Sequence, residues 1–180
     1  MITHQLATVS DVPGVLKLQE LNLVSNLTVA EKQKGFVTTP FTNSQLAEII
    51  SLNGLYISKI DDEIIAYLFA GSWEYFSQWE IFNYMVSRFP ILSFQDQPLT
   101  TSNSFQYGPV CIDVRYRGSG LFNQLFELMR IDYLKKYPIS ITFINKINQI
   151  SVAAHTRKLG WKIIDIFQFK IMACQTDCQN

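Results

Sequence analysis

The stretch that decides the fold is Val110-Cys111-Ile112-Asp113-Val114-Arg115-Tyr116-Arg117-Gly118-Ser119-Gly120-Leu121-Phe122. Its first part is apolar and typical of a buried strand, and the long apolar segment after Gly120 is typical of a helix. Gly118 and Gly120 allow backbone conformations that a side chain would obstruct. The unpaired N–H groups of the turn and of the first helical turn then converge, with the positive end of the helix dipole behind them. The segment therefore predicts an anion-binding cradle.

The glycine spacing matches neither the dinucleotide fingerprint nor the phosphate loop that ends in Gly-Lys-Ser/Thr. Instead, Tyr116-Arg117-Gly118-Ser119-Gly120 resembles the pyrophosphate-binding motif of the GNAT superfamily of acyl-CoA N-acyltransferases, which reads Arg/Gln-x-x-Gly-x-Gly/Ala at the start of a helix. The residues from Arg117 to Phe122 occupy its six positions. Phe122 departs from the pattern, because the family usually has a small residue there.

Both ends of the chain are also similar to this family. The opening Ala7-Thr8-Val9-Ser10-Asp11-Val12 resembles its first strand-to-helix junction, and the segment from Asn148 to Leu159-Gly160-Trp161 resembles its late helix and the Leu-Gly-Phe that follows. The resemblance implies that acetyl-CoA is the cosubstrate and that no metal is needed. The cofactor contacts that it implies are Val110, Cys111, Ile112, Arg117, Gly118, Ser119, Gly120, Leu121, Phe122 and Asn148.

The same resemblance implies a catalytic position seven residues after Asn148. The family usually has a tyrosine there that protonates the departing thiolate, and this chain has His155. A histidine can exchange protons near neutral pH, so the role is chemically adequate. The distance from His155 to Gly160 is one residue longer than the family's pattern. Three alternatives therefore stay open: His155, Thr156, or no side-chain acid at all.

The general base is unassigned; Glu74, Glu80, Asp113, Tyr67 and Tyr107 are each more typical of structural or solvent-facing residues.

The rest of the chain alternates between strand and helix patterns. The expected strands are residues 2–8, 54–60, 64–70, 105–114, 139–144 and 162–172, and the expected helices are residues 10–22, 44–50, 121–137 and 149–159. This order predicts an α/β protein of the α+β type, with a mixed, mostly antiparallel sheet of about six to seven strands flanked by helices. By the resemblance, two of these strands splay apart to hold acyl-CoA.

Aromatic residues crowd the segment from Trp73 to Phe94. Phe76, Trp79, Phe82 and Val86 have helical spacing, so the rings either pack a helix on the sheet or also line an acceptor pocket.

Composition narrows the class of protein. Among 180 residues, 48% are hydrophobic and only 17% are charged, which excludes disorder of the whole chain. Fifteen basic residues balance fifteen acidic ones, so we expect no nucleic-acid partner.

The sequence has no apolar run of membrane-spanning length and no signal-peptide pattern, so we expect a cytoplasmic protein with no membrane partner. Cys174 and Cys178 have no histidine and no second cysteine pair near them in the sequence, so we expect no metal site. We expect one acyltransferase-like domain over residues 1–172 and a polar tail over residues 173–180.

The leading hypothesis is an N-acetyltransferase that moves an acetyl or short acyl group from acetyl-CoA to a primary amine, directly, in a ternary complex. The acceptor is a small molecule or a peptide, and a homodimer is an open alternative. A competing hypothesis is an acyl-CoA-binding or regulatory module without turnover. A third is a protein-interaction domain built around the aromatic segment. Acyl transfer through Cys111 lacks a recognisable histidine or carboxylate partner.

Overall fold

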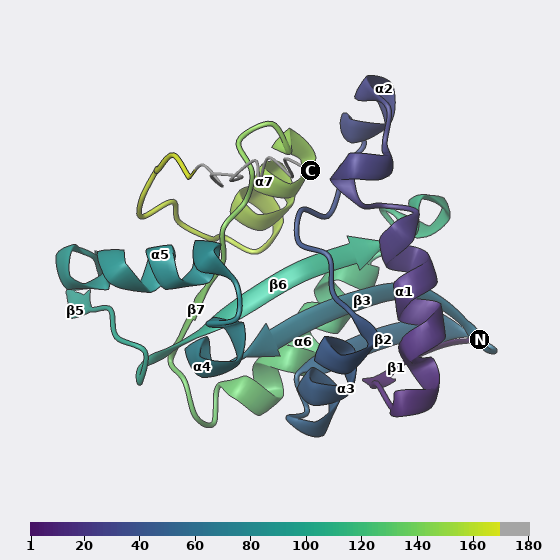
Figure 1. The fold of residues 1–180 in the computed structure, drawn as a ribbon, viewed down its shortest axis with the longest axis horizontal. Coiled ribbons are helices and arrows are strands. Elements are labelled where there is room, and N and C mark those ends of the chain that lie inside the picture. The colour runs from purple at the N-terminus through teal and green to yellow at the C-terminus, as the bar shows by residue number, and fades with distance from the viewer. Residues whose placement is uncertain (170–180) are drawn as a thin grey trace, which may run out of the picture.

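The computed structural model describes residues 1–169. A five-stranded sheet forms its centre, in the order β1-β2-β3-β6-β7. All neighbours are antiparallel except β6 and β7, which are parallel. The strands are β1 (Ile2–Leu6), β2 (Leu55–Ile60), β3 (Glu63–Gly71), β6 (Ser104–Ile112) and β7 (Ile139–Ile141). Figure 1 shows β6 crossing the middle of the molecule next to β3.

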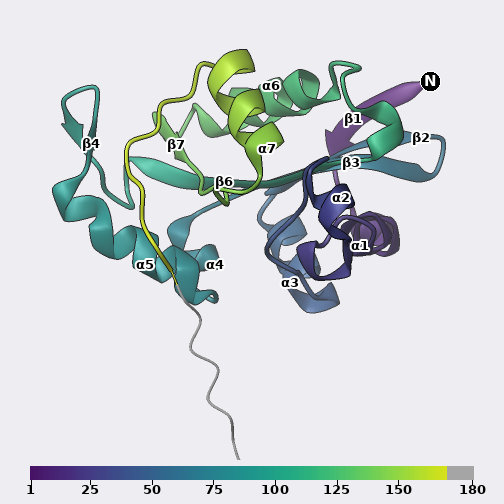
Figure 2. The same ribbon diagram turned by 90° about the horizontal axis from the view of Figure 1, so that it is seen from above.

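Helices cover both faces of the sheet, as the edge-on view in Figure 2 shows. One face carries α1 (Val12–Glu20), α2 (Val29–Lys32), α3 (Asn43–Ser51), α4 (Trp73–Phe76) and α5 (Glu80–Arg88); the other carries α6 (Leu121–Tyr133) and α7 (Gln149–Ala153). A separate small hairpin, β4 (Ser93–Phe94) with β5 (Gln97–Pro98), follows α5. Single 3-10 turns span Val9–Asp11, Val24–Asn26, Phe89–Ile91 and Val114–Tyr116.

Two apolar cores hold these layers together. On the face of α1 to α5, Ile57, Tyr67 and Phe69 of the sheet pack with residues of those helices. On the other face, Leu121, Leu125 and Met129 of α6 are buried against the sheet. Their spacing of four residues puts them on one side of the helix, which explains how a helix with this pattern docks on a flat surface.

The expected fold class, a mixed and mostly antiparallel sheet between helices, is confirmed, but the strand count differs. The segment 162–169 contains no strand, and residues 170–172 of that expected strand lie outside the described residues, as does the tail 173–180. Side chains attach this segment to α5 instead: Asp165 forms an ion pair with Arg88, and the rings of Phe167 and Tyr84 lie 5.2 Å apart. The expected hairpin at residues 54–70 is confirmed by β2 and β3.

The aromatic segment is split into α4 and α5 rather than forming one helix. Trp73, Tyr75, Phe76 and Phe82 are all buried in the core. These four rings therefore pack the helices on the sheet rather than forming an exposed interaction surface, and Phe82 also lines the cavity described below.

Candidate active site

The parallel strands β6 and β7 part after only three paired positions. The last pair is Gln106 with Ile141, so the later residues of β6 have no strand neighbour on that side within the described chain. A register shift in the pairing of β6 with β3 lies between Tyr107 and Val110, where Gly108 has a φ of +89°. Such a bulge bends its strand and re-aims the side chains beside it. Beyond the last β6–β7 pair, residues 107–110 and 142–145 line an opening between the two segments.

A cavity of about 60 Å³ occupies this opening. It is lined by β6, by the segment after β7, by α7 and by the loop at residues 36–39. Three of the four buried side-chain polar atoms that have no hydrogen-bond partner in residues 1–169 belong to residues lining it: Gln106 Oε1, Tyr107 Oη and His155 Nε2. Buried polar atoms are normally satisfied, so this clustering indicates a binding site.

A larger hollow of about 760 Å³ lies between α1, α2 and the segment 113–117. None of the four buried polar atoms without a hydrogen-bond partner in residues 1–169 belongs to a residue that lines this larger hollow. Its charged residues include Arg115, which forms ion pairs with Glu63 and Asp113. The smaller cavity therefore has the stronger features of a reaction site.

The glycine loop lies at the end of β6, as the sequence predicts. Gly118 and Gly120 have φ angles of +82° and +93°, and α6 begins directly after Gly120 without a side-chain cap. A Cβ added at either glycine would meet no atom within 4 Å. The helix N-terminus is therefore open, with unpaired N–H groups that suit a phosphate. Leu121, by contrast, is buried against the sheet.

Arg117 has a structural role in addition to its place in the loop. Its guanidinium donates hydrogen bonds to the carbonyl oxygen of Ile112 (2.9 Å), to Oδ1 of Asn22 (2.9 Å) and to the carbonyl oxygen of Lys34. These bonds tie the end of β6 to the turn after α1 and to the segment after α2. The side chain thus holds the loop in place and is already engaged with protein oxygens.

Asn148 likewise ties elements together. Its side chain accepts a hydrogen bond from the N–H of Ser151, which caps α7, and donates one to the carbonyl oxygen of Phe36 (2.9 Å). It is buried and lines the cavity. Asn148 therefore fixes both α7 and the loop at residues 36–39 around the opening.

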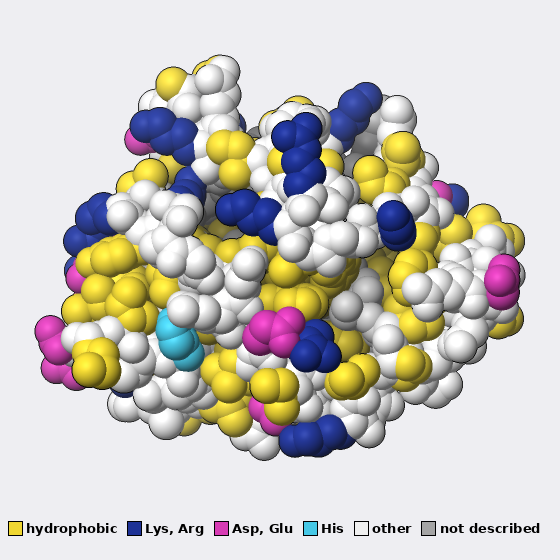
Figure 3. All heavy atoms as spheres, turned by 180° about the vertical axis from the view of Figure 1, so that it is seen from behind, with side chains coloured by type: hydrophobic (Ala, Val, Ile, Leu, Met, Phe, Trp, Pro, Cys, Tyr) yellow, Lys and Arg dark blue, Asp and Glu magenta, His cyan; other side chains and the backbone are white. Residues whose placement is uncertain are grey.

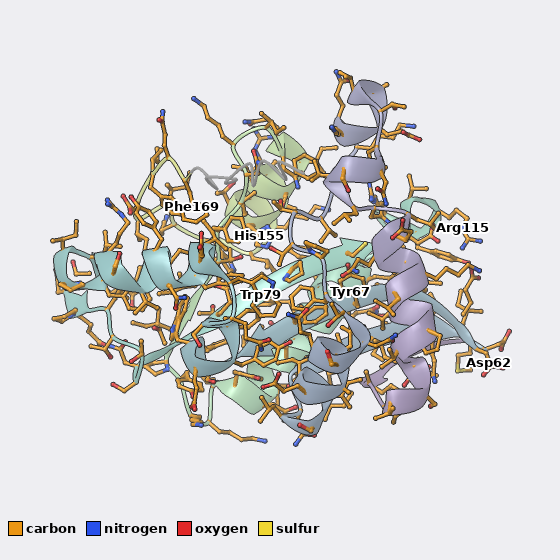
Figure 4. All side chains as sticks on the ribbon, viewed as in Figure 1. Asp62, Tyr67, Trp79, Arg115, His155 and Phe169 are labelled. Carbon is orange, nitrogen blue, oxygen red and sulfur yellow. The ribbon has the colours of Figure 1, made fainter. Side chains whose placement is uncertain are left out.

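The extra residue between His155 and Gly160 is absorbed by a turn of π-helix over Ala154–Lys158. Single π-turns accommodate one additional residue in a helix and occur often at functional sites. His155 is buried between α7 and β6 (Figure 4), and its ring contacts those of Tyr107, Phe122 and Trp161, with centroids 5.1 to 5.5 Å apart. The extra residue therefore leaves His155 at the cavity.

The protonation of His155 follows from its neighbours. Nδ1 lies 2.8 Å from the carbonyl oxygen of Ser151, which can only accept, so Nδ1 carries the hydrogen and Nε2 has the lone pair in the neutral ring. Burial lowers the pKa of His155, and the hydrogen bond to Ser151 opposes that shift. Thr156 donates its hydroxyl hydrogen to the carbonyl oxygen of Val152 (2.9 Å), so that proton is engaged within the helix.

The remaining candidates for acid, base or nucleophile are poorly suited. Burial raises the pKa of Cys111 to about 12, so this thiol is protonated at neutral pH. Burial also raises the pKa values of Tyr67 and Tyr107. Asp113 is bound by Arg115, and that hydrogen bond lowers its pKa. Glu74 and Glu80 are exposed and do not line the cavity.

Sequence reasoning missed two parts of the site: Gln106 and the loop at residues 36–39. Gln106 carries a signal that could have been used, because it is a polar residue in an otherwise buried strand. The loop has no such signal, since its place depends on hydrogen bonds with Asn148 and with the backbone of Asn22, both distant in the chain.

The described residues contain no cluster of three or more histidine, cysteine or acidic side chains that could hold a metal ion. They also contain no helix that is both long and apolar enough to span a membrane. Charged side chains of both signs are interspersed with hydrophobic ones on the face in Figure 3.

Comparison with solved structures identifies the fold. The chain superposes on the aminoglycoside N-acetyltransferase AAC(6')-Iy in complex with CoA, with a TM-score of 0.63, 14% identity and coverage of 97% of this chain and 96% of that one. The aminoglycoside 6'-N-acetyltransferase AAC(6')-Ih from Acinetobacter baumannii superposes with a TM-score of 0.61 and 15% identity, over 97% of this chain and 99% of that one. A possible acetyltransferase from Clostridium difficile 630 superposes with a TM-score of 0.54 and 16% identity, over 97% of this chain and 99% of that one. No protein-family model and no curated protein matches the sequence.

The chain therefore has the fold of the GCN5-related N-acetyltransferases, as the loop motif predicts. Two of these three structures are aminoglycoside N-acetyltransferases, and one of the two is a complex with CoA.

Proposed function

We propose that this protein is an N-acetyltransferase that transfers an acetyl or short acyl group from acetyl-CoA to a primary amine in a ternary complex. The observation that carries the proposal is that β6 lines the cavity and leads, through one 3-10 turn, to the uncapped N-terminus of α6. A thioester in the opening and a pyrophosphate at the loop would lie at the two ends of the pantetheine arm of acetyl-CoA. The GNAT fold supports the same assignment.

The cosubstrate would be held mainly by main chain. The unpaired edge of β6 at Val110, Cys111 and Ile112 is available to the pantetheine arm, except that the Ile112 carbonyl is already bonded to Arg117. The loop from Gly118 to Phe122 would receive the pyrophosphate.

His155 would serve both proton transfers of the reaction. As the amine nitrogen attacks the thioester carbon, a C–N bond forms and Nε2 accepts the proton that the nitrogen loses. The C–S bond then breaks, and the imidazolium returns this proton to the sulfur, which leaves as the CoA thiol. The Ser151 carbonyl at Nδ1 stabilises the transient imidazolium. A buried, neutral histidine suits this order, because it must accept a proton before it donates one.

One observation favours the non-catalytic alternative. Phe122 stands where the family has a small residue, and its ring lies 5.1 Å from that of His155. A ring at this place narrows the approach to Nε2, so a module that binds acyl-CoA without turnover stays a candidate.

One experiment separates the two functions. The protein is incubated with acetyl-CoA and a panel of amines while thiol release is followed, and CoA binding is measured separately by calorimetry. Acceptor-dependent thiol release supports the transferase. Tight CoA binding without release on any amine supports the binding module, and the absence of CoA binding contradicts both.

A further inference from the structure

Two buried glutamines differ in how their side chains are satisfied. Gln19 bonds at both ends to the backbone of Phe41: its Nε2 donates to the carbonyl oxygen (3.1 Å) and its Oε1 accepts from the N–H (2.9 Å). Gln106 donates through Nε2 to the carbonyl oxygen of Tyr107 (2.8 Å), but its Oε1 has no partner among the described residues. Gln106 is only 1% exposed. An unpaired buried acceptor is costly for stability, so a fold keeps one mainly where a ligand completes it.

The position of Gln106 matches such a role. It is the last residue of β6 that pairs with β7, and it lines the cavity at the point where the strands part. Successive side chains of a strand face opposite sides of the sheet. Tyr107 packs in the core on the α6 side, where its ring contacts His155. Gln106 therefore faces the side of α1 to α5, opposite the imidazole across the opening.

The cavity around Gln106 is uncharged. Its lining residues include no aspartate, glutamate, lysine or arginine, and four of them are Phe36, Val37, Phe82 and Phe143. The volume of about 60 Å³ exceeds the roughly 10–15 Å³ that one water needs, so a small functional group fits there. An amide oxygen can accept a hydrogen bond but cannot take up a proton at neutral pH.

We propose that Oε1 of Gln106 accepts a hydrogen bond from an N–H of the attacking amine, and that the acceptor carries this amine on an apolar or aromatic body. The inference rests on the proposed acetyl transfer and deepens it. Gln106 binds and orients the nucleophile, and the proton leaves through His155 on the other side. The lining provides no carboxylate that would select a polycationic acceptor.

The test compares Gln106→Met with Gln106→Glu and with the matched control Gln19→Met. Tryptamine is titrated into CoA-saturated protein by calorimetry at about pH 9, where a larger share of the amine is neutral, and 3-ethylindole, which lacks the amino group, is titrated in parallel. We expect Gln106→Met to weaken tryptamine binding by roughly 5- to 20-fold with CoA affinity unchanged. Gln106→Glu keeps an acceptor oxygen but loses the donor to the Tyr107 carbonyl oxygen, so its affinity should lie between those of Gln106→Met and the wild type. Binding of 3-ethylindole should not respond to either change.

Thermal unfolding distinguishes binding from a structural role. Gln106→Met removes an unsatisfied oxygen and one hydrogen bond to the Tyr107 carbonyl oxygen, whereas Gln19→Met removes two hydrogen bonds to the Phe41 backbone, so Gln106→Met should lower Tm less than Gln19→Met does. Wild-type affinity for tryptamine in Gln106→Met, or no tryptamine binding by the wild type, would overturn the inference. Amine binding that depends on Gln106 without acetyl transfer would support it while contradicting the proposed function. If the protein transfers acetyl groups and Gln106→Met leaves the KM for the amine unchanged, the proposed function is supported and the inference about Gln106 is contradicted.

Discussion

Gly120 and Gly160 form a matched pair for testing the anion cradle. Both glycines have positive φ angles, +93° and +70°, and a Cβ added at either would meet no protein atom within 4 Å. Replacement by alanine should therefore introduce backbone strain at either position and lower the free energy of unfolding by about 1–2 kcal/mol. For a chain of this size, that corresponds to a Tm lower by roughly 2–8 °C.

Only Gly120 begins a helix whose N-terminus is open. The added methyl group there would occupy the space in which a phosphate contacts the N–H groups. Losing one charge-assisted hydrogen bond costs about 1.5–3 kcal/mol, so CoA should bind about 10- to 150-fold more weakly to Gly120→Ala. Gly120→Asp adds a negative charge and should abolish binding.

Calorimetric titration with CoA, together with thermal unfolding of each variant, measures both effects. Gly160→Ala should lose stability and keep the wild-type affinity. If folded Gly120→Ala and Gly120→Asp bind CoA as the wild type does, the loop does not cradle the pyrophosphate.

Four further predictions concern single side chains. His155→Ala should lower kcat by roughly 10²–10⁴ with little change in CoA affinity, and His155→Tyr should recover part of the rate; an unchanged rate and pH profile would exclude the imidazole from proton transfer. Because burial lowers the pKa of His155 in the folded state, the unfolded chain binds more protons below the unfolded pKa of about 6.5, so stability should fall as pH drops through that region. The decline should be shallower in His155→Asn, and His4→Asn serves as the histidine control in thermal unfolding at a series of pH values. Arg117→Leu should lower Tm by several degrees, since three oxygens lose their donor; a Tm equal to that of the wild type would show that these bonds do not hold the loop. Cys111→Ala should retain acetyl transfer, and the wild-type thiol should resist alkylation in the folded protein, because burial raises its pKa to about 12; loss of transfer together with rapid alkylation would indicate a nucleophilic cysteine.

The sequence predicts the parts of this fold that depend on local signals. Gly118 and Gly120 mark the turn into α6, and the acidic turn after Ile60 marks the hairpin of β2 and β3. In each case the residues that determine the conformation lie within a few positions of one another. The same holds for the apolar spacing that docks α6 on the sheet.

The remaining features depend on contacts between distant residues. Arg117 looks like a phosphate ligand in sequence, but its partners come from residues 22, 34 and 112. The segment 162–169 has the composition of a strand, yet the ion pair between Arg88 and Asp165 holds it against α5. Spacing alone shows that the helix after Asn148 must absorb an extra residue, and only the structure places it in a π-turn.

The central claim is that an acetyl group moves from acetyl-CoA to an amine at the opening between β6 and β7. The most direct measurement follows release of the CoA thiol and the mass of each amine together, for the wild type and His155→Ala, over a panel that includes apolar, aromatic and polycationic primary amines. We predict that the wild type releases thiol in step with the appearance of an acetylated amine and that His155→Ala does so far more slowly. Saturating CoA binding with no acetylated product from any amine would contradict the claim.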